Sequence, residues 1–376
     1  MKKLMQLFAG MLLMNACIDR VNIRVPDSYN SQMVVDGLIT DEPGPYTVKL
    51  SLSSRVESFL EFSTRPVTLA NVTIFDNVGN SELLEDKGKG TYQTKPNGIR
   101  GVVGREYAVR IETYEGKVYE SVPDKMNPPG EIDNLYYKLN SFQPLDAPTQ
   151  YGFLVFVDAQ GAPESDNLFR WKFTGTYVID TNPEFHTIAC IAGPCCPDPR
   201  PCSGMILSSI GVLQRISDCT CCVCWVNQYE DKPFVSDNQF ISNGKFRNIE
   251  VAYVPIDYWT FVRKYRLEVK QMSLSRTAFD YFKTIQSQKE GGSSLFQPPT
   301  GRIRTNVFEK GGSEVQGIFY ASSVRLKQVY VNNDDLKGLF LHIPNRNVCD
   351  NDPKLVIESC LLAFKHSSNQ PPADWQ

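Results

Sequence analysis

Histidine is scarce in this chain of 376 residues, and the usual signatures of catalysis are missing. The three histidines, His186, His342 and His366, lie far apart and do not have the spacing of a metal site on one helix. There is no Gly-x-Ser-x-Gly elbow, no phosphate-binding P-loop and no evident pairing of a nucleophile with a base. We therefore expect a protein that is not an enzyme, has no catalytic residues, binds no metal and needs no cofactor.

An excess of positive charge is also lacking. The chain has 39 Lys and Arg against 42 Asp and Glu, which gives a formal net charge of -3. A protein that binds a phosphate backbone needs a clustered basic face. We therefore expect no nucleic-acid partner.

Hydrophobic runs long enough to cross a bilayer, about 20 residues, are absent from the sequence. The apolar run Leu4–Leu13 is short and is interrupted by Gln6 and Gly10. It follows two lysines and is separated from Cys17 by Met14-Asn15-Ala16, so a small residue directly precedes the cysteine, as in a secretory signal peptide. The cysteine directly after the small residue resembles the bacterial lipobox, whose thiol is diacylated. The alternative is a plain secretory signal followed by an incidental cysteine.

Lipidation would fix the location of the protein. We expect residues 1–16 to be a signal peptide, Cys17 to carry palmitate-type acyl chains, and residues 17–30 to be a lipidated tether. Each buried methylene contributes roughly 0.8 kcal/mol, so two or three acyl chains anchor a protein stably. Because Ile18 and not an aspartate follows Cys17, the outer membrane is the expected site. The sequence leaves open whether the protein faces the periplasm or the cell surface.

Ten further cysteines indicate disulfides, since an even number of cysteines outside the cytoplasm typically forms pairs. Cys349 and Cys360 lie near the end of the sequence, and we expect them to pair with each other. For the other eight the connectivity stays open, and zinc is the alternative for thiols two residues apart. These eight are Cys190, Cys195, Cys196, Cys202, Cys219, Cys221, Cys222 and Cys224.

Alternating apolar and polar residues predict a mainly β fold. Residues Tyr46–Leu52 and Tyr107–Glu112 alternate with a period of two, which is typical of strands with one buried face. Glu115-Gly116 predicts a hairpin turn. Short strands and closely spaced turns over residues 31–127 predict an N-terminal β-sandwich of immunoglobulin or transthyretin type.

A second β-rich domain is expected over residues 131–376, after the Asn127-Pro128-Pro129-Gly130 break. Tyr265–Met272 has the clearest strand alternation. One helix is predicted to begin after a capping Ser275 and to end at Gly291-Gly292. Residues 190–224 are predicted to be a disulfide-rich insertion in which covalent links replace a hydrophobic core.

Short motifs follow one another over nearly the whole chain. They are Val34–Thr40, Tyr46–Leu50, Ala70–Ile74, Gly104–Tyr107, the helix from Ser275, Pro298-Pro299, Gly317–Ser323 and Pro371–Trp375. In this order they resemble a Bacteroidota lipoprotein family that is known only as a domain of unknown function. That family is typically encoded beside TonB-dependent outer-membrane transporters, so the resemblance implies an accessory role at a transporter barrel. It implies no particular site residues.

Two functions fit these observations. The first is a non-enzymatic outer-membrane lipoprotein that serves as an accessory or ligand-capture subunit of a TonB-dependent transporter, with a ligand that the sequence does not identify. The second is a surface adhesin or matrix-binding module, with residues 190–224 as its contact loop.

Overall fold

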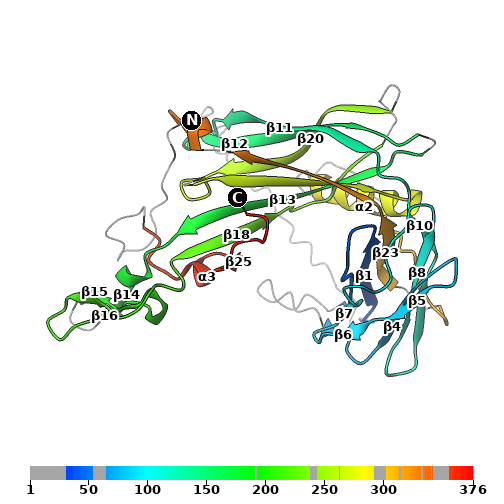
Figure 1. The fold of residues 1–376 in the computed structure, drawn as a ribbon, viewed down its shortest axis with the longest axis horizontal. Helices are drawn as coiled ribbons and strands as arrows, with labels where there is room; N and C mark the ends of the chain where they lie inside the picture. The colour runs from blue at the N-terminus through cyan, green and yellow to red at the C-terminus, as the bar shows by residue number, and fades with distance from the viewer. Residues whose placement is uncertain are drawn as a thin grey trace, which may run out of the picture.

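The computed structural model describes residues 31–53, 65–163, 165–190, 193–237, 244–261, 263–291, 302–312, 315–331, 333–339, 341 and 355–375. The expected signal peptide, Cys17, the tether and Cys349 lie outside these residues. The described chain is mainly β, as predicted, and forms layered sheets with one long helix (Figure 1). None of the helices described is both long and apolar enough to span a membrane.

Two sheets pack against each other to form the first sandwich (Figure 1). Their inward residues, among them Val35, Val48, Ile74 and Val109, are fully buried, as the alternation predicted. The predicted turn at Glu115-Gly116 is present. One sheet contains β23 (Val315–Ser322), β1 (Met33–Thr40), β2 (Thr47–Leu52), β7 (Thr91–Gln93), β6 (Glu85–Asp86) and β3 (Arg65–Pro66). The other contains β22 (Val307–Glu309), β9 (Val118–Ser121), β8 (Glu106–Glu112), β4 (Asn71–Asp76), β5 (Ser81–Leu83) and β10 (Asp124–Lys125).

The first sandwich is not continuous in sequence. Strand β23 pairs in parallel with β1, and β22 pairs with β9, so residues 307–322 complete both sheets. Phe319 of β23 is fully buried in the same core as Val35. The expected division into residues 31–127 and 131–376 therefore needs a correction. Period-two alternation identifies a strand but does not specify a partner that lies hundreds of residues away.

Two further sheets pack face to face in the second unit, around Phe153, Trp171, Phe246 and Tyr265 (Figure 1). One consists of β11 (Glu131–Phe142), β12 (Gln150–Gln160) and β20 (Lys245–Ile256). The other consists of β24 (Val324–Val331), β21 (Tyr265–Ser273), β13 (Phe169–Asp180), β18 (Val223–Tyr229), β25 (Ser367–Ser368) and β19 (Phe234–Ser236). Helix α3 (Cys360–Ala363) and the 3-10 turn η3 (Asn333–Leu336) are also part of this unit.

Helix α2 (Arg276–Gly291) joins the two units. Ser275 caps it as predicted, since its Oγ accepts a hydrogen bond from the Ala278 amide at 3.1 Å. Its apolar face packs on Ile318 and Tyr320 of the first sandwich and on Met272 of the second unit.

Asp124 is buried at this junction. Its carboxylate accepts hydrogen bonds from Ser275 Oγ at 2.5 Å and from the Ala321 amide at 2.9 Å. Burial raises the pKa of Asp124 to about 6, although both hydrogen bonds act to lower it. The junction therefore contains a carboxyl group that titrates in a mildly acidic range.

The cysteine-rich region is an insertion between β13 and β18, which pair with each other. It contains the hairpins β14 (Thr187–Cys190) with β15 (Gly193–Pro197) and β16 (Met205–Leu207) with β17 (Leu213–Arg215), together with η1 (Pro183–Phe185) and η2 (Pro201–Ser203). Figure 1 shows these hairpins at the end of the molecule away from the first sandwich.

In the described part of the chain, disulfides connect Cys202 with Cys221, Cys219 with Cys222 and Cys224 with Cys360. The expected pairing of Cys360 with Cys349 is therefore wrong. Cys224 and Cys360 meet because α3 packs beside β18, a contact that residue spacing does not reveal.

Candidate functional site

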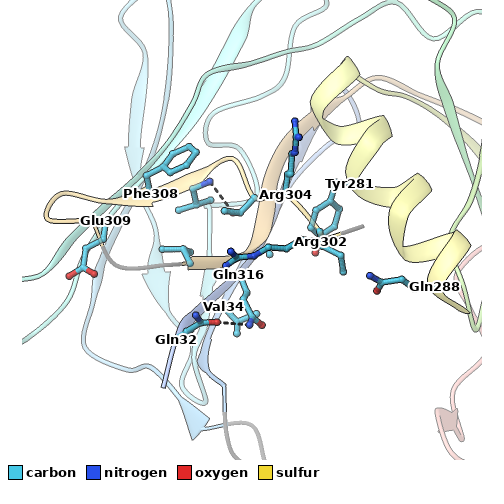
Figure 2. Close-up of a pocket in the computed structure, with 15 residues that line it drawn as sticks. Gln32, Val34, Tyr281, Gln288, Arg302, Arg304, Phe308, Glu309 and Gln316 are labelled. Atoms are coloured by element: carbon cyan, nitrogen blue, oxygen red, sulfur yellow. Dashed lines mark hydrogen bonds between the residues drawn. The ribbon is translucent and has the colours of Figure 1, made fainter. Parts of the chain in front are cut away.

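A pocket of about 840 Å³ lies between the edge of the first sandwich and helix α2 (Figure 2). Strands β1, β22 and β23 form one side, α2 forms the opposite side, and residues 302–305 contribute two arginines. The pocket therefore lies where segments far apart in sequence meet.

The strand side of the pocket is largely apolar. Val34 presents aliphatic surface and Phe308 an exposed aromatic ring, while Val307 and Val315 line the pocket as buried residues of the sandwich core. Gln316 donates a hydrogen bond to Gln32 at 2.6 Å, from Nε2 to Oε1, so their amide groups form a polar pair beside these residues (Figure 2).

Close approach of the β1 and β23 backbones requires Gly317. Its φ of +90° lies in the left-handed region, and a Cβ there would be 1.9 Å from the Val35 carbonyl oxygen. Any side chain at this position would disturb the parallel pairing that forms the strand side of the pocket.

Asn306 positions the segment that carries the arginines. This buried side chain donates to the Phe319 carbonyl at 2.7 Å and accepts from the Phe319 amide at 3.1 Å. The backbone carbonyl of Asn306 also accepts a hydrogen bond from the Val122 amide at 2.8 Å. Asn306, two residues after Arg304, is therefore hydrogen-bonded to both sheets of the sandwich.

Arg302 and Arg304 are both lining residues; in Figure 2 the Arg302 side chain extends toward Gln316, whereas the Arg304 guanidinium points away from Gln32 and Gln316. Arg304 is exposed and has no ion pair or hydrogen bond with any described residue. Glu309 is the one acid among the described lining residues, and its carboxylate lies 3.9 Å from the Lys117 ammonium group. The guanidinium of Arg304 is therefore available to a negatively charged group.

Helix α2 contributes Tyr281 and Gln288 (Figure 2). Burial and, to a smaller extent, the nearby Asp36 carboxylate raise the pKa of the Tyr281 phenol to about 12. Tyr281 is therefore protonated at neutral pH and can act as a hydrogen-bond donor.

The lining combines guanidinium, amide and phenol groups with an apolar surface. Guanidinium groups bind carboxylates and phosphates through charge-assisted hydrogen bonds, while the aliphatic side chains contact an apolar body. The arrangement suits a small ligand with an acidic group and an apolar or ring-shaped body.

The predicted site residues lie elsewhere in the molecule. The cysteine-rich region contains Cys190 in β14 and the disulfide-bonded Cys195 and Cys196 in β15. Cys219 and Cys222, which have the spacing of zinc ligands, are joined by a disulfide. No group of three or more His, Cys, Asp or Glu side chains in the described part of the chain is arranged to hold a metal ion.

Sequence reasoning missed Arg302 and Arg304. The only signal was a pair of basic residues, Gly301-Arg302-Ile303-Arg304, after a Pro-rich segment, and this pattern is too short to indicate binding.

These features define a mainly β protein in which two sheet pairs are joined by a helix and one unit carries disulfide-linked hairpins. The sequence model of a family described as a domain of unknown function (DUF4249) matches residues 18–328, and the chain belongs to this family. The predicted resemblance is thus confirmed at the level of the family.

Comparison with other known proteins adds little. No curated protein matches the sequence. A solved structure titled "Biofilm associated protein - BSP domain" aligns with 82% of this chain at 6% identity and a TM-score of 0.12. The alignment covers 62% of that protein, so the chain spans less than two thirds of its length.

Proposed function

We propose that this chain is a non-enzymatic, lipid-anchored outer-membrane protein that captures a small acidic ligand and acts as an accessory subunit of a TonB-dependent transporter. The observation that carries the proposal is the pocket between the first sandwich and α2, in which Arg304 has no ionic partner among the described residues. A pocket that combines positive charge with apolar surface is suited to binding, and its described lining residues contain no pairing of a nucleophile with a base.

Two features of the sequence support the cellular part of the proposal. The Ala16-Cys17 pair resembles a lipobox, and the family resemblance implies a neighbouring transporter. Capture at the membrane surface would raise the local concentration of a ligand near the transporter.

Binding of acidic probes tests the pocket. We expect octanoate to bind more tightly than octanol, and glucuronate more tightly than glucose, in isothermal titration calorimetry. Arg304→Gln should weaken binding of the acidic member of a pair by about tenfold or more, because a charge-assisted hydrogen bond is lost. Arg65→Gln is the matched control, since Arg65 is an exposed arginine of the same sandwich that does not line the pocket.

Equal binding of the acidic and neutral probes, or equal effects of the two substitutions, would contradict the role of Arg304.

Co-purification tests the transporter. We expect the natively expressed protein, solubilised in mild detergent, to retain a TonB-dependent transporter. If a ligand binds but no transporter is retained, capture stands and the accessory role is refuted.

A further inference from the structure

The β16–β17 hairpin has an uncharged apolar tip. Residues 201–214 contain no Asp, Glu, Lys, Arg or His. The side chains of Ile206, Ile210 and Val212 are 43%, 82% and 54% exposed, respectively. Aliphatic side chains concentrated on one exposed tip indicate an interaction surface, because their exposure to water is unfavourable.

The turn at this tip satisfies much of its own backbone hydrogen bonding. The Ser208 amide donates to the Val212 carbonyl at 2.9 Å, and the Gly211 amide donates to the Ser208 carbonyl at 2.9 Å. The Val212 amide donates to Ser208 Oγ at 3.1 Å. Because an unpaired amide is costly to remove from water, this pattern lowers the cost of burying the turn in an apolar environment.

The base of the hairpin is fixed. The Cys202–Cys221 disulfide joins the segments that precede and follow the hairpin, and the Cys219–Cys222 disulfide lies just after it in sequence. The Ile216 amide donates to the Gly204 carbonyl at 2.8 Å. Charge appears only at this base, where Arg215 and Asp218 form an exposed ion pair at 2.6 Å. The apolar tip and the charged base are therefore separated along the hairpin.

We infer that this tip inserts into the interfacial region of a lipid bilayer. Protein interfaces depend on Trp, Tyr and Arg anchors, and residues 201–214 contain none of the three. Aliphatic side chains enter a bilayer favourably, whereas a charged side chain costs several kcal/mol. An insertion of roughly 5–10 Å would leave the Arg215–Asp218 pair among the lipid headgroups.

Vesicle flotation tests this inference without the acyl anchor. Residues 18–376, which lack both the expected signal peptide and Cys17, are mixed with vesicles of phosphatidylethanolamine and phosphatidylglycerol. We expect the protein to float with the vesicles at both low and high salt, because the tip is uncharged. Ile210→Asp combined with Val212→Asp should lower the partition coefficient at least about tenfold. Leu145→Asp is the matched control, since Leu145 is 93% exposed in a different loop.

Fluorescence gives a second measurement. Ile210→Trp should shift its emission to shorter wavelength on vesicles, and Leu145→Trp should not. Circular dichroism and a free-thiol count establish that each variant is folded with its disulfides formed.

Four results would overturn the inference. They are the absence of flotation, release by salt, an equal loss in Leu145→Asp, and dimerisation or capture of an envelope protein through Ile210 while the vesicles stay unbound. None of them bears on ligand binding at Arg304, so the two proposals can fail separately.

Discussion

The first sandwich and the cysteine-rich region are stabilised by different means. The sandwich buries a continuous cluster that includes Tyr92, Tyr107 and Phe319, with side chains from strands hundreds of residues apart. Within residues 195–222, Cys221 is the one buried apolar side chain. Disulfides connect this second region instead. A region without a core can keep its apolar side chains exposed, because covalent links hold its shape.

The largest effect is expected from the core of the first sandwich. Phe319→Ala removes a fully buried ring from β23, and we expect unfolding to require about 3–5 kcal/mol less free energy. Phe308→Ala is the matched control, because Phe308 lies in the neighbouring strand β22 and its side chain is 54% exposed. Denaturant unfolding measures both. Similar losses for the two variants would show that β23 is not an integral part of the sandwich.

The second largest effect is expected from the long-range disulfide. Cys224→Ala combined with Cys360→Ala opens a link across 136 residues, which should cost about 2–5 kcal/mol. Because α3 loses its covalent attachment to β18, proteases should also cut residues 355–375 faster.

Cys219→Ala combined with Cys222→Ala is the control for loop length. This link spans only 3 residues, and the chain-entropy model gives it a stabilisation of about 2 kcal/mol or less. A larger loss from the short link than from the long one would contradict the chain-entropy account of this region.

Local sequence signals predicted the elements of both regions. The alternation in Tyr265–Met272 corresponds to β21, and Ser275 caps α2. These signals depend on neighbouring residues, which a sequence displays directly.

Partners distant in sequence could not be predicted. Packing of the sheets determines the parallel pairing of β1 with β23 and the Cys224–Cys360 disulfide. The alternation of apolar and polar residues along a strand does not specify which distant strand or cysteine becomes its partner. The pocket depends on the same packing, because Arg304 and Val34 meet only after β23 joins β1. The candidate site was therefore less predictable than the elements that form it.

The smallest effect is expected at the junction of the two units, where Asp124 makes a buried polar contact beside the apolar face of α2. Asp124 has a folded-state pKa of about 6, above the value near 3.9 expected in the unfolded chain. Well below pH 4 the carboxyl is protonated in both states, and the folded state has its full relative stability. As the pH rises from about 4 to about 6, the unfolded chain releases this proton while the folded chain keeps it. The free energy of unfolding therefore falls by about 1–3 kcal/mol over this range. Above about pH 6 it does not change further through this group.

Asp124→Asn removes this titration and should keep the junction intact. The amide oxygen can accept from the Ala321 amide, and the amide nitrogen can donate to Ser275 Oγ. We expect the variant to be at least as stable as the wild type at pH 7, with the difference between them fading as the pH falls toward 4. Urea unfolding at several pH values measures this difference. A wild type that gains stability over the variant as the pH rises would show that the ionised carboxylate is the favoured form, and that the two hydrogen bonds outweigh burial.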